Sequence, residues 1–160
     1  MASNYLLAEI CPPDWHRYGE SCYFIITVEM DWFEANRTSA ESRAIIAIPN
    51  SQSEENYIYR ELFQKNVDQT QGAELWIGCN DIEEEGKWQH CPLKGETNGY
   101  ENWVVGEPNN HNGADCMHIW NDQWDDTICY YSKYAICERH VSTPVSTTIA
   151  HLVTRPLKND

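Results

Sequence analysis

The sequence of 160 residues is long enough for one domain of ordinary size and too short for two. Its formal net charge of −14 argues against nucleic acid and anionic membranes as partners, because both repel an acidic surface. No stretch approaches the roughly 20 apolar residues of a membrane helix, so no membrane insertion is expected.

Seven cysteines in a small acidic chain are typical of a secreted or extracellular protein that is stapled by disulfide bonds. Their wide spacing, without a Cys-x-x-Cys pair, argues against a structural zinc site. The odd number leaves at least one thiol unpaired or bonded to another chain. The N-terminal sequence lacks the basic and apolar segments of a signal peptide, which favours a mature or recombinant form of an exported protein.

The first half of the sequence predicts a hairpin, a helix and a short strand after a leader at residues 1–10. Residues 11–24 hold two cysteines around Pro, Gly and aromatic residues, which predicts a disulfide-stapled hairpin. Residues 31–45 carry apolar or small side chains at helical spacing, and residues 45–49 form a short apolar run that is typical of a buried strand.

A second helix is predicted from the capping-box pair Ser51 and Glu54, in which each side chain can satisfy a backbone N–H of the first helical turn. Its inner face is expected to carry Ile58, Leu62 and Phe63, which recur at helical spacing.

The second half is predicted to be rich in strands that are separated by long irregular loops. Helices followed by strands favour an α+β fold over an alternating α/β one. The Ser/Thr/Pro-bearing residues 140–160 form a tail or linker to which no chemistry is assigned. The runs expected as strands are residues 75–79, 87–91, 101–105, 116–120, 127–131 and 134–138.

Several motifs follow one another in a fixed order along residues 11–139, and together they resemble a C-type lectin-like domain of the long form. The resemblance implies an α+β fold with two helices, antiparallel sheets and long irregular calcium-binding loops. The motifs are Cys11 and Cys22, Trp76-Ile77-Gly78, Glu107-Pro108-Asn109, Cys116, a loop led by Trp124, Cys129 and Cys137.

The resemblance also implies two disulfide bonds, Cys11–Cys22 and Cys116–Cys129. Each closes a loop of about a dozen residues, which in the chain-entropy model stabilises the fold by roughly 3 kcal/mol.

The remaining cysteines depart from the family pattern. Relatives bond their last cysteine, here Cys137, to a cysteine on the first helix, and that position is Ser39 in this sequence. Cys79 and Cys91 lie on neighbouring predicted strands and could bond to each other, which would leave Cys137 as the odd thiol. A buried thiol and a bond to a second chain both remain open for Cys137.

The resemblance implies a calcium site formed by Glu107, Asn109, Asp125 and Asp126. Ca²⁺ takes six to eight oxygen ligands, and irregular loops can supply them from carboxylates and amides. The family uses a cis proline, here Pro108, to direct the two side chains beside it at one ion. A plain surface turn is the alternative for the Glu-Pro-Asn segment alone, but the nearby Trp-Asp-Asp sequence favours calcium.

The same four side chains would bind sugar, because two neighbouring hydroxyls complete the calcium shell in sugar-binding relatives. The Glu-Pro-Asn order resembles the mannose-type site, which implies mannose-type glycans with mannose, fucose or GlcNAc-like vicinal hydroxyls. Two positions depart from those relatives. Asp125 replaces an asparagine, so an amide donor is lost, and Ala114 replaces a ligand glutamate.

A second, auxiliary calcium site is implied at Asp81, Glu85, Asn110 and Asp115. The missing glutamate at position 114 would also have served there. A solvated acidic turn is an equally good interpretation of residues 81–85.

The sequence does not predict an enzyme. Its six histidines are scattered without His-Glu-x-x-His spacing, and it contains no Gly-x-Ser-x-Gly motif and no phosphate-binding glycine loop. The predicted function is a calcium-dependent lectin for mannose-type glycans. The alternative, favoured by Ala114 and Asp125, is a protein-recognition module on the same fold with weak or no sugar binding. Lectins of this kind usually need several copies for avidity, and the sequence does not show how they would assemble.

Overall fold

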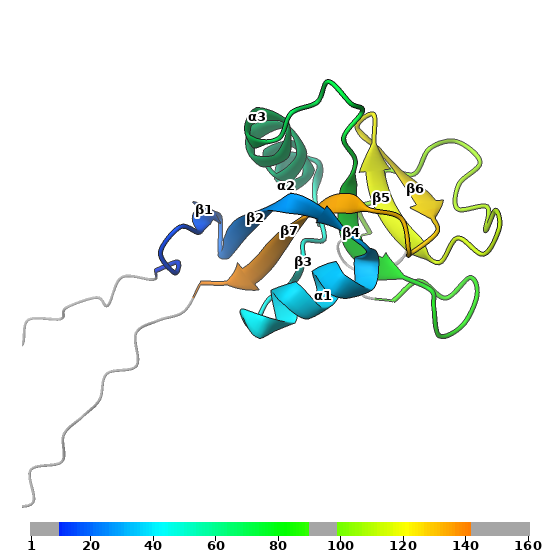
Figure 1. Ribbon diagram of the computed structural model, residues 1–160, viewed down its shortest axis with the longest axis horizontal. Coiled ribbons are helices and arrows are strands. Elements are labelled where there is room, and N and C mark those ends of the chain that lie inside the picture. Colours follow the sequence, from blue (N-terminus) through cyan, green and yellow to red (C-terminus); the bar gives the residue numbers. More distant parts are fainter. Residues whose placement is uncertain (1–9, 90–98, 142–160) are drawn as a thin grey trace, which may run out of the picture.

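The computed structural model describes residues 10–89 and 99–141 of the chain (Figure 1). The expected leader, residues 1–9, and the tail beyond residue 141 lie outside the described residues. In chain order the elements are β1 (His16–Tyr18), β2 (Ser21–Met30), α1 (Trp32–Glu41), β3 (Ile45–Ile46), α2 (Gln52–Glu55), the π-helix η1 (Asn56–Phe63), α3 (Gln64–Asn66), β4 (Leu75–Asn80), β5 (Cys116–Trp120), β6 (Gln123–Thr127) and β7 (Lys133–His140).

The strands follow the order β1-β2-β7-β4-β5-β6, with β3 also paired to β7. Neighbouring strands are antiparallel except β4 and β7, which run parallel where Leu75 lies beside Tyr134. The parallel pair is possible because a long connection separates the two strands in the sequence. Strand β7 comes last but lies between β2 and β4, so it joins the two halves of the fold.

Both predicted helices are present and begin where their capping residues stand. The Asp31 carboxylate accepts the N–H of Glu34 at 2.8 Å at the start of α1. The Ser51 hydroxyl accepts the N–H of Glu54 at 3.2 Å, which confirms one half of the predicted capping box. The Glu54 carboxylate accepts the N–H of Asn50 at 2.7 Å instead of that of Ser51. The predicted inner residues of that helix are buried, and they are Ile58, Leu62 and Phe63.

Strands β3, β4, β5 and β7 confirm the strands predicted at 45–49, 75–79, 116–120 and 134–138, and the antiparallel β1–β2 pair confirms the hairpin predicted at 11–24. The runs predicted at 101–105 and 127–131 are not strands: residues 101–105 form a loop in which Trp103 makes an isolated bridge to Trp124, and residues 128–131 follow Thr127, the last residue of β6. In the run at 87–91, Gln89 makes an isolated bridge to Asn80, and residues 90 and 91 lie outside the described residues. Strand β6 was missed. In the loop at 101–105, Trp103 packs against Trp124 with ring centroids 5.8 Å apart, so the aromatic side chain is partly buried without a strand around it.

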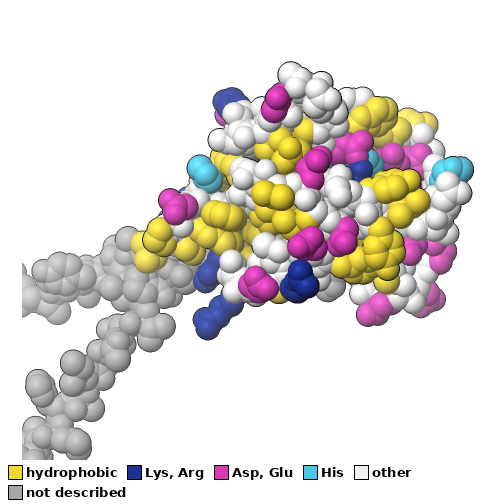
Figure 2. All heavy atoms as spheres, in the orientation of Figure 1, with side chains coloured by type: hydrophobic (Ala, Val, Ile, Leu, Met, Phe, Trp, Pro, Cys, Tyr) yellow, Lys and Arg dark blue, Asp and Glu magenta, His cyan; other side chains and the backbone are white. Residues whose placement is uncertain are grey.

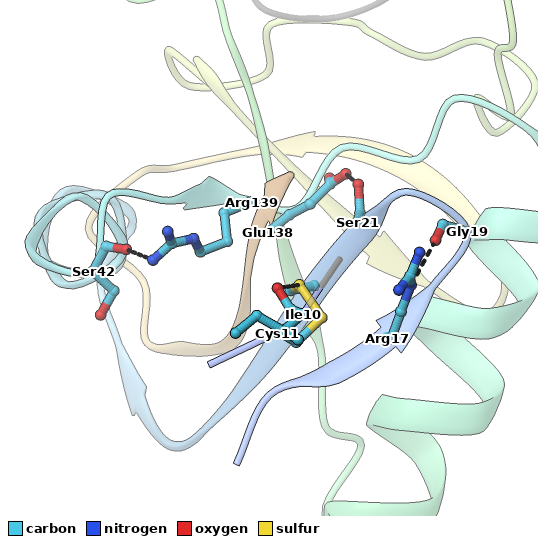
Figure 3. The surroundings of a disulfide bond; sticks show 9 residues. Ile10, Cys11, Arg17, Gly19, Ser21, Ser42, Glu138 and Arg139 are labelled. Carbon is cyan, nitrogen blue, oxygen red and sulfur yellow. Dashed lines mark hydrogen bonds between the residues drawn. A yellow bond between two sulfur atoms is a disulfide. The ribbon is translucent and has the colours of Figure 1, made fainter. Parts of the chain in front are cut away.

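The two disulfide bonds implied by the resemblance are formed, Cys11–Cys22 and Cys116–Cys129. Figure 3 shows the first of them beside β2, where the Ser21 hydroxyl donates to the Glu138 carboxylate of β7 at 2.8 Å. Cys79 is also disulfide-bonded. Its proposed partner, Cys91, lies outside the described residues.

Cys137 is a buried free thiol, which agrees with the first of the two alternatives left open by the sequence. It is 2% exposed, and its Sγ is in close contact with the Ser39 Oγ of α1. Burial raises the pKa of this thiol, which keeps it protonated. A bond to a second chain would require this part of the core to open.

The surface is acidic, as the composition requires. Figure 2 shows carboxylate side chains spread over the face in view, with few basic side chains and with hydrophobic patches between them. No helix in the described part of the chain is long and apolar enough to cross a membrane.

Candidate metal centre

The structure brings Glu107, Asp125 and Asp126 together. One carboxylate oxygen from each lies within 4.8 Å of the others. Glu107 comes from the loop that follows residue 105, where the Glu107–Pro108 peptide bond is cis, as predicted. Asp125 and Asp126 come from β6, at the end of the molecule away from β1 (Figure 1).

The β5–β6 hairpin places the two aspartates. Its turn residues, Asn121 and Asp122, both have positive φ angles of 50° and 64°, which is typical of a tight hairpin turn. The register sets Asp125 opposite His118 and Asp126 opposite Met117. The Cys116–Cys129 disulfide then closes the base of the hairpin.

Trp124 anchors the start of the aspartate pair. Its side chain is 1% exposed, and its indole N–H donates to the Glu55 carboxylate at 2.9 Å. Its backbone N–H donates to the Asn102 carbonyl at 2.8 Å, and its carbonyl accepts from Val104 at 2.9 Å. These bonds hold β6 against the loop that leads to Glu107.

Asp126 organises the neighbouring loop. Its two carboxylate oxygens accept the backbone N–H groups of Asn109 and Asn110 at 3.0 and 2.6 Å. The Asn109 side chain lies between two partners. Its amide nitrogen donates to Glu107 Oε1 at 2.8 Å, and its oxygen accepts the N–H of His111 at 2.7 Å. The four predicted ligands therefore form one connected cluster.

The electrostatics of the cluster favour a cation. The pKa of Glu107 is raised by partial burial and by the neighbouring carboxylates of Asp125 and Asp126. Glu107 Oε2 is buried and has no hydrogen-bond partner among the described residues. Clustered carboxylate and amide oxygens are the donor set that Ca²⁺ prefers, so the residues present fit this ion.

His118 is a neighbour of the site that the sequence did not reveal. Its Nε2 lies 3.6 Å from Asp125 Oδ2, and burial lowers its pKa. His118 lies beside Asp125 because the β5–β6 register pairs the two residues, and this register is known only from the fold. Ala114, which stands where relatives have a ligand glutamate, is buried and brings no oxygen-bearing side chain.

The predicted auxiliary ligands also gather in part. Oxygens of Asp81, Glu85 and Asp115 lie within 4.8 Å of one another. Asp81 is 2% exposed, and its Oδ1 has no hydrogen-bond partner in the described part of the chain. Its Oδ2 accepts the N–H of Gly86 at 2.8 Å. Burial, together with the charges of Asp115 and Asp126, raises the pKa of Asp81 despite this bond. Asn110, the fourth residue, donates its backbone N–H to Asp126.

Comparison with known proteins identifies the family. The model of the lectin C-type domain matches residues 28–139, and the chain belongs to this family. The family and its fold are those of recognition modules and not of enzymes, which confirms that part of the sequence analysis.

The relatives agree with this assignment. The chain is 30% identical over 127 residues to the hepatic lectin of Gallus gallus, an alignment that covers 78% of this chain and 58% of that protein. The chain thus spans less than two thirds of that relative's length. The mouse scavenger receptor C-type lectin carbohydrate-recognition domain has a TM-score of 0.68 at 26% identity, with 82% of this chain and 98% of that one covered. A calcium-independent type II antifreeze protein has a TM-score of 0.69 at 25% identity, with coverage of 84% and 98%.

Proposed function

We propose that this domain binds carbohydrate through a calcium ion held by Glu107, Asn109, Asp125 and Asp126, with preference for mannose-type glycans. The observation that carries the proposal is the convergence of three carboxylates around a buried Glu107 oxygen that lacks a hydrogen-bond partner among the described residues. The likeness to the hepatic lectin and to a carbohydrate-recognition domain supports sugar as the ligand. The disulfide bonds support a secreted or extracellular location.

Different side chains would bind the two sugar hydroxyls. Bound Ca²⁺ would accept two neighbouring sugar hydroxyls as ligands. Beside it, Glu107 accepts a hydrogen bond from the first hydroxyl, and the Asn109 amide donates one to it. Asn109 already donates one N–H to Glu107 at 2.8 Å, and its second N–H remains for the sugar. For the second hydroxyl, Asp125 accepts but cannot donate when ionised.

Retention on immobilised mannose tests the proposal. We expect the domain to bind the resin in calcium, to elute with a chelator and to resist elution by galactose. Elution by galactose as readily as by mannose would contradict the mannose-type assignment.

The alternative function is protein recognition on the same fold. Ala114 and Asp125 favour it, since each departs from the sugar-binding pattern, and the calcium-independent antifreeze protein shows that this fold also serves without calcium. Failure to bind any glycan while calcium still raised the melting temperature would favour this alternative.

Replacing Asp125 by asparagine should strengthen sugar binding. The amide restores a donor to the second hydroxyl, and one hydrogen bond of about 1–3 kcal/mol corresponds to a gain of roughly 5- to 150-fold in affinity. The measurement is methyl α-mannoside affinity at saturating calcium. Asp125→Ala, which removes the carboxylate without adding a donor, is the control and should show no gain. An unchanged affinity in a calcium-loaded Asp125→Asn variant would contradict the division of roles given above.

Calcium affinity should fall as the pH falls. Ligand carboxylates bind Ca²⁺ only when ionised, and the raised pKa of Glu107 makes protons compete from a higher pH than at an ordinary glutamate. We expect the dissociation constant, measured by calcium titration, to rise steadily from about pH 7 to about pH 4. A flat profile across this range would speak against carboxylate ligands.

We also propose an auxiliary ion at Asp81, Glu85, Asn110 and Asp115. The buried Asp81 oxygen without a hydrogen-bond partner in the described residues supports it. Asp81→Asn should reduce the calcium stoichiometry by one and leave the ion at Glu107 in place. An unchanged stoichiometry would leave residues 81–85 as a solvated acidic turn.

A further inference from the structure

A second groove lies next to the proposed calcium site and shares a wall with it. The groove has a volume of about 590 Å³, within the roughly 300–1,000 Å³ typical of small-molecule sites. Asp125, Thr127 and Tyr131 line both this groove and the hollow around Glu107 and Asn109. The two hollows therefore adjoin, so a ligand of more than one sugar residue that is held at the calcium site is close to the groove.

We propose that this groove is a subsite for the next residue of a neutral oligosaccharide whose terminal sugar occupies the calcium site. The inference rests on the proposed function, and it adds to it the class of ligand: a linear or branched neutral glycan of at least two residues, bound more tightly than the single sugar.

Aromatic side chains form the exposed walls of the groove. Trp120, the last residue of β5, is 48% exposed, and Tyr131, in the turn before β7, is 52% exposed. Large aromatic side chains that remain half exposed beside a hollow offer apolar faces to a ligand. The C–H face of a pyranose ring can pack on such a surface while its hydroxyl groups point elsewhere. Trp120 lines the groove and not the hollow around the proposed ion. A substitution of Trp120 therefore changes the groove without changing a residue that lines the calcium site.

Polar groups stand deeper in the groove. The Lys133 ammonium group and the Glu74 carboxylate are paired there, and the Lys133 side chain is 6% exposed. The side chain of His118 is likewise 6% exposed, and its Nδ1 has no hydrogen-bond partner within residues 10–89 and 99–141, although Glu74 Oε2 is 3.3 Å away. These groups can donate and accept hydrogen bonds to and from sugar hydroxyls.

The charge balance favours a neutral ligand over an anionic one. Glu74 and Asp125 each contribute a negative charge to the lining, and Lys133 contributes a single positive charge that Glu74 already pairs. The whole chain carries a formal net charge of −14. A sulfate or carboxylate on the second sugar would therefore meet a net negative wall.

The test compares the binding of a monosaccharide and of a trisaccharide to four proteins. Calorimetry or competition in saturating calcium gives the affinity for methyl α-mannoside and for the α1,3/α1,6-linked mannotriose. The proteins are the unaltered domain, Trp120→Ala, Trp120→Phe and Tyr130→Ala. Tyr130 is a matched control, because it is an aromatic residue beside Tyr131, is 75% exposed and lines neither hollow.

For the unaltered domain we expect the trisaccharide to bind about three- to tenfold more tightly than the single sugar, the range of one aromatic contact. Trp120→Ala should lose this gain while its methyl α-mannoside affinity stays unchanged, which also shows that the variant is folded. Trp120→Phe should keep part of the gain, and Tyr130→Ala should keep all of it. A trisaccharide sulfated on its outer residue should bind more weakly than the neutral one.

Equal affinity for the two sugars, or a Trp120→Ala variant that retains the full gain, would overturn the subsite while leaving the calcium-dependent lectin intact. Tighter binding of the sulfated sugar would overturn its neutral specificity. The absence of chelator-sensitive binding of either sugar would instead overturn the proposed function and the subsite together.

Discussion

Replacing Ser39 by cysteine should create a further disulfide bond between α1 and β7 and stabilise the domain strongly. Ser39 Oγ and Cys137 Sγ are already in close contact, and both residues are buried. The two positions are 98 residues apart in the sequence. In the chain-entropy model a loop of this length stabilises by up to about 4.7 kcal/mol, which for a domain of this size corresponds to a rise in Tm of roughly 5–15 °C.

The measurement is thermal unfolding of the Ser39→Cys protein after oxidative refolding, together with a count of its free thiols. Ser39→Cys combined with Cys137→Ser is the matched control, since it carries the first substitution without the possibility of a bond. The control should show none of the gain. Two titratable thiols in folded Ser39→Cys would show that the contact does not support a bond.

Replacing Asp126 by asparagine should abolish calcium binding at the main site. Asp126 is 7% exposed, contributes a carboxylate to the cluster and accepts the N–H groups of Asn109 and Asn110. The substitution removes one charge and replaces one acceptor by a donor that faces a backbone N–H. Mutation of a residue that only orients a metal ligand typically lowers metal affinity about 10–100-fold. Loss of the ligand Asp126 itself should therefore lower calcium affinity by at least about 100-fold.

Asp122→Asn is the matched control for that substitution. Asp122 belongs to the same hairpin, in the turn between β5 and β6, but its side chain is 51% exposed and pairs with Arg60 at 3.2 Å. It should leave calcium affinity and mannose retention unchanged. An Asp126→Asn protein that is still retained on mannose in a chelator-sensitive manner would remove Asp126 from the site.

The side chains that the structure gathers around Glu107 were predictable from the sequence because the loop motifs are local. Glu107, Pro108 and Asn109 are consecutive, and so are Asp125 and Asp126, so each segment carries its own signature. The cap at Ser51 was predictable for the same reason, since it needs only a glutamate three residues later. The contact between the two segments is long-range, and it was predictable only from the family resemblance.

The neighbours of the site were not predictable from local pattern. His118 reaches Asp125 through strand pairing, and Lys133 meets Glu74 across 59 residues of sequence. Strand β6 was missed because Trp-Asp-Asp lacks the apolar alternation of a strand, although Asn121-Asp122 between two extended runs was an available hairpin signal. The run at 101–105 resembles a strand in sequence because it holds Trp103 and two valines, but Trp103 packs inward from a loop.

Titration calorimetry of the intact domain with Ca²⁺, beside the Asp126→Asn variant, tests the central claim most directly. The account predicts saturable binding with an ion at Glu107, Asn109, Asp125 and Asp126, and the loss of that ion in the variant. No heat at millimolar calcium, or the same binding in both proteins, would contradict it.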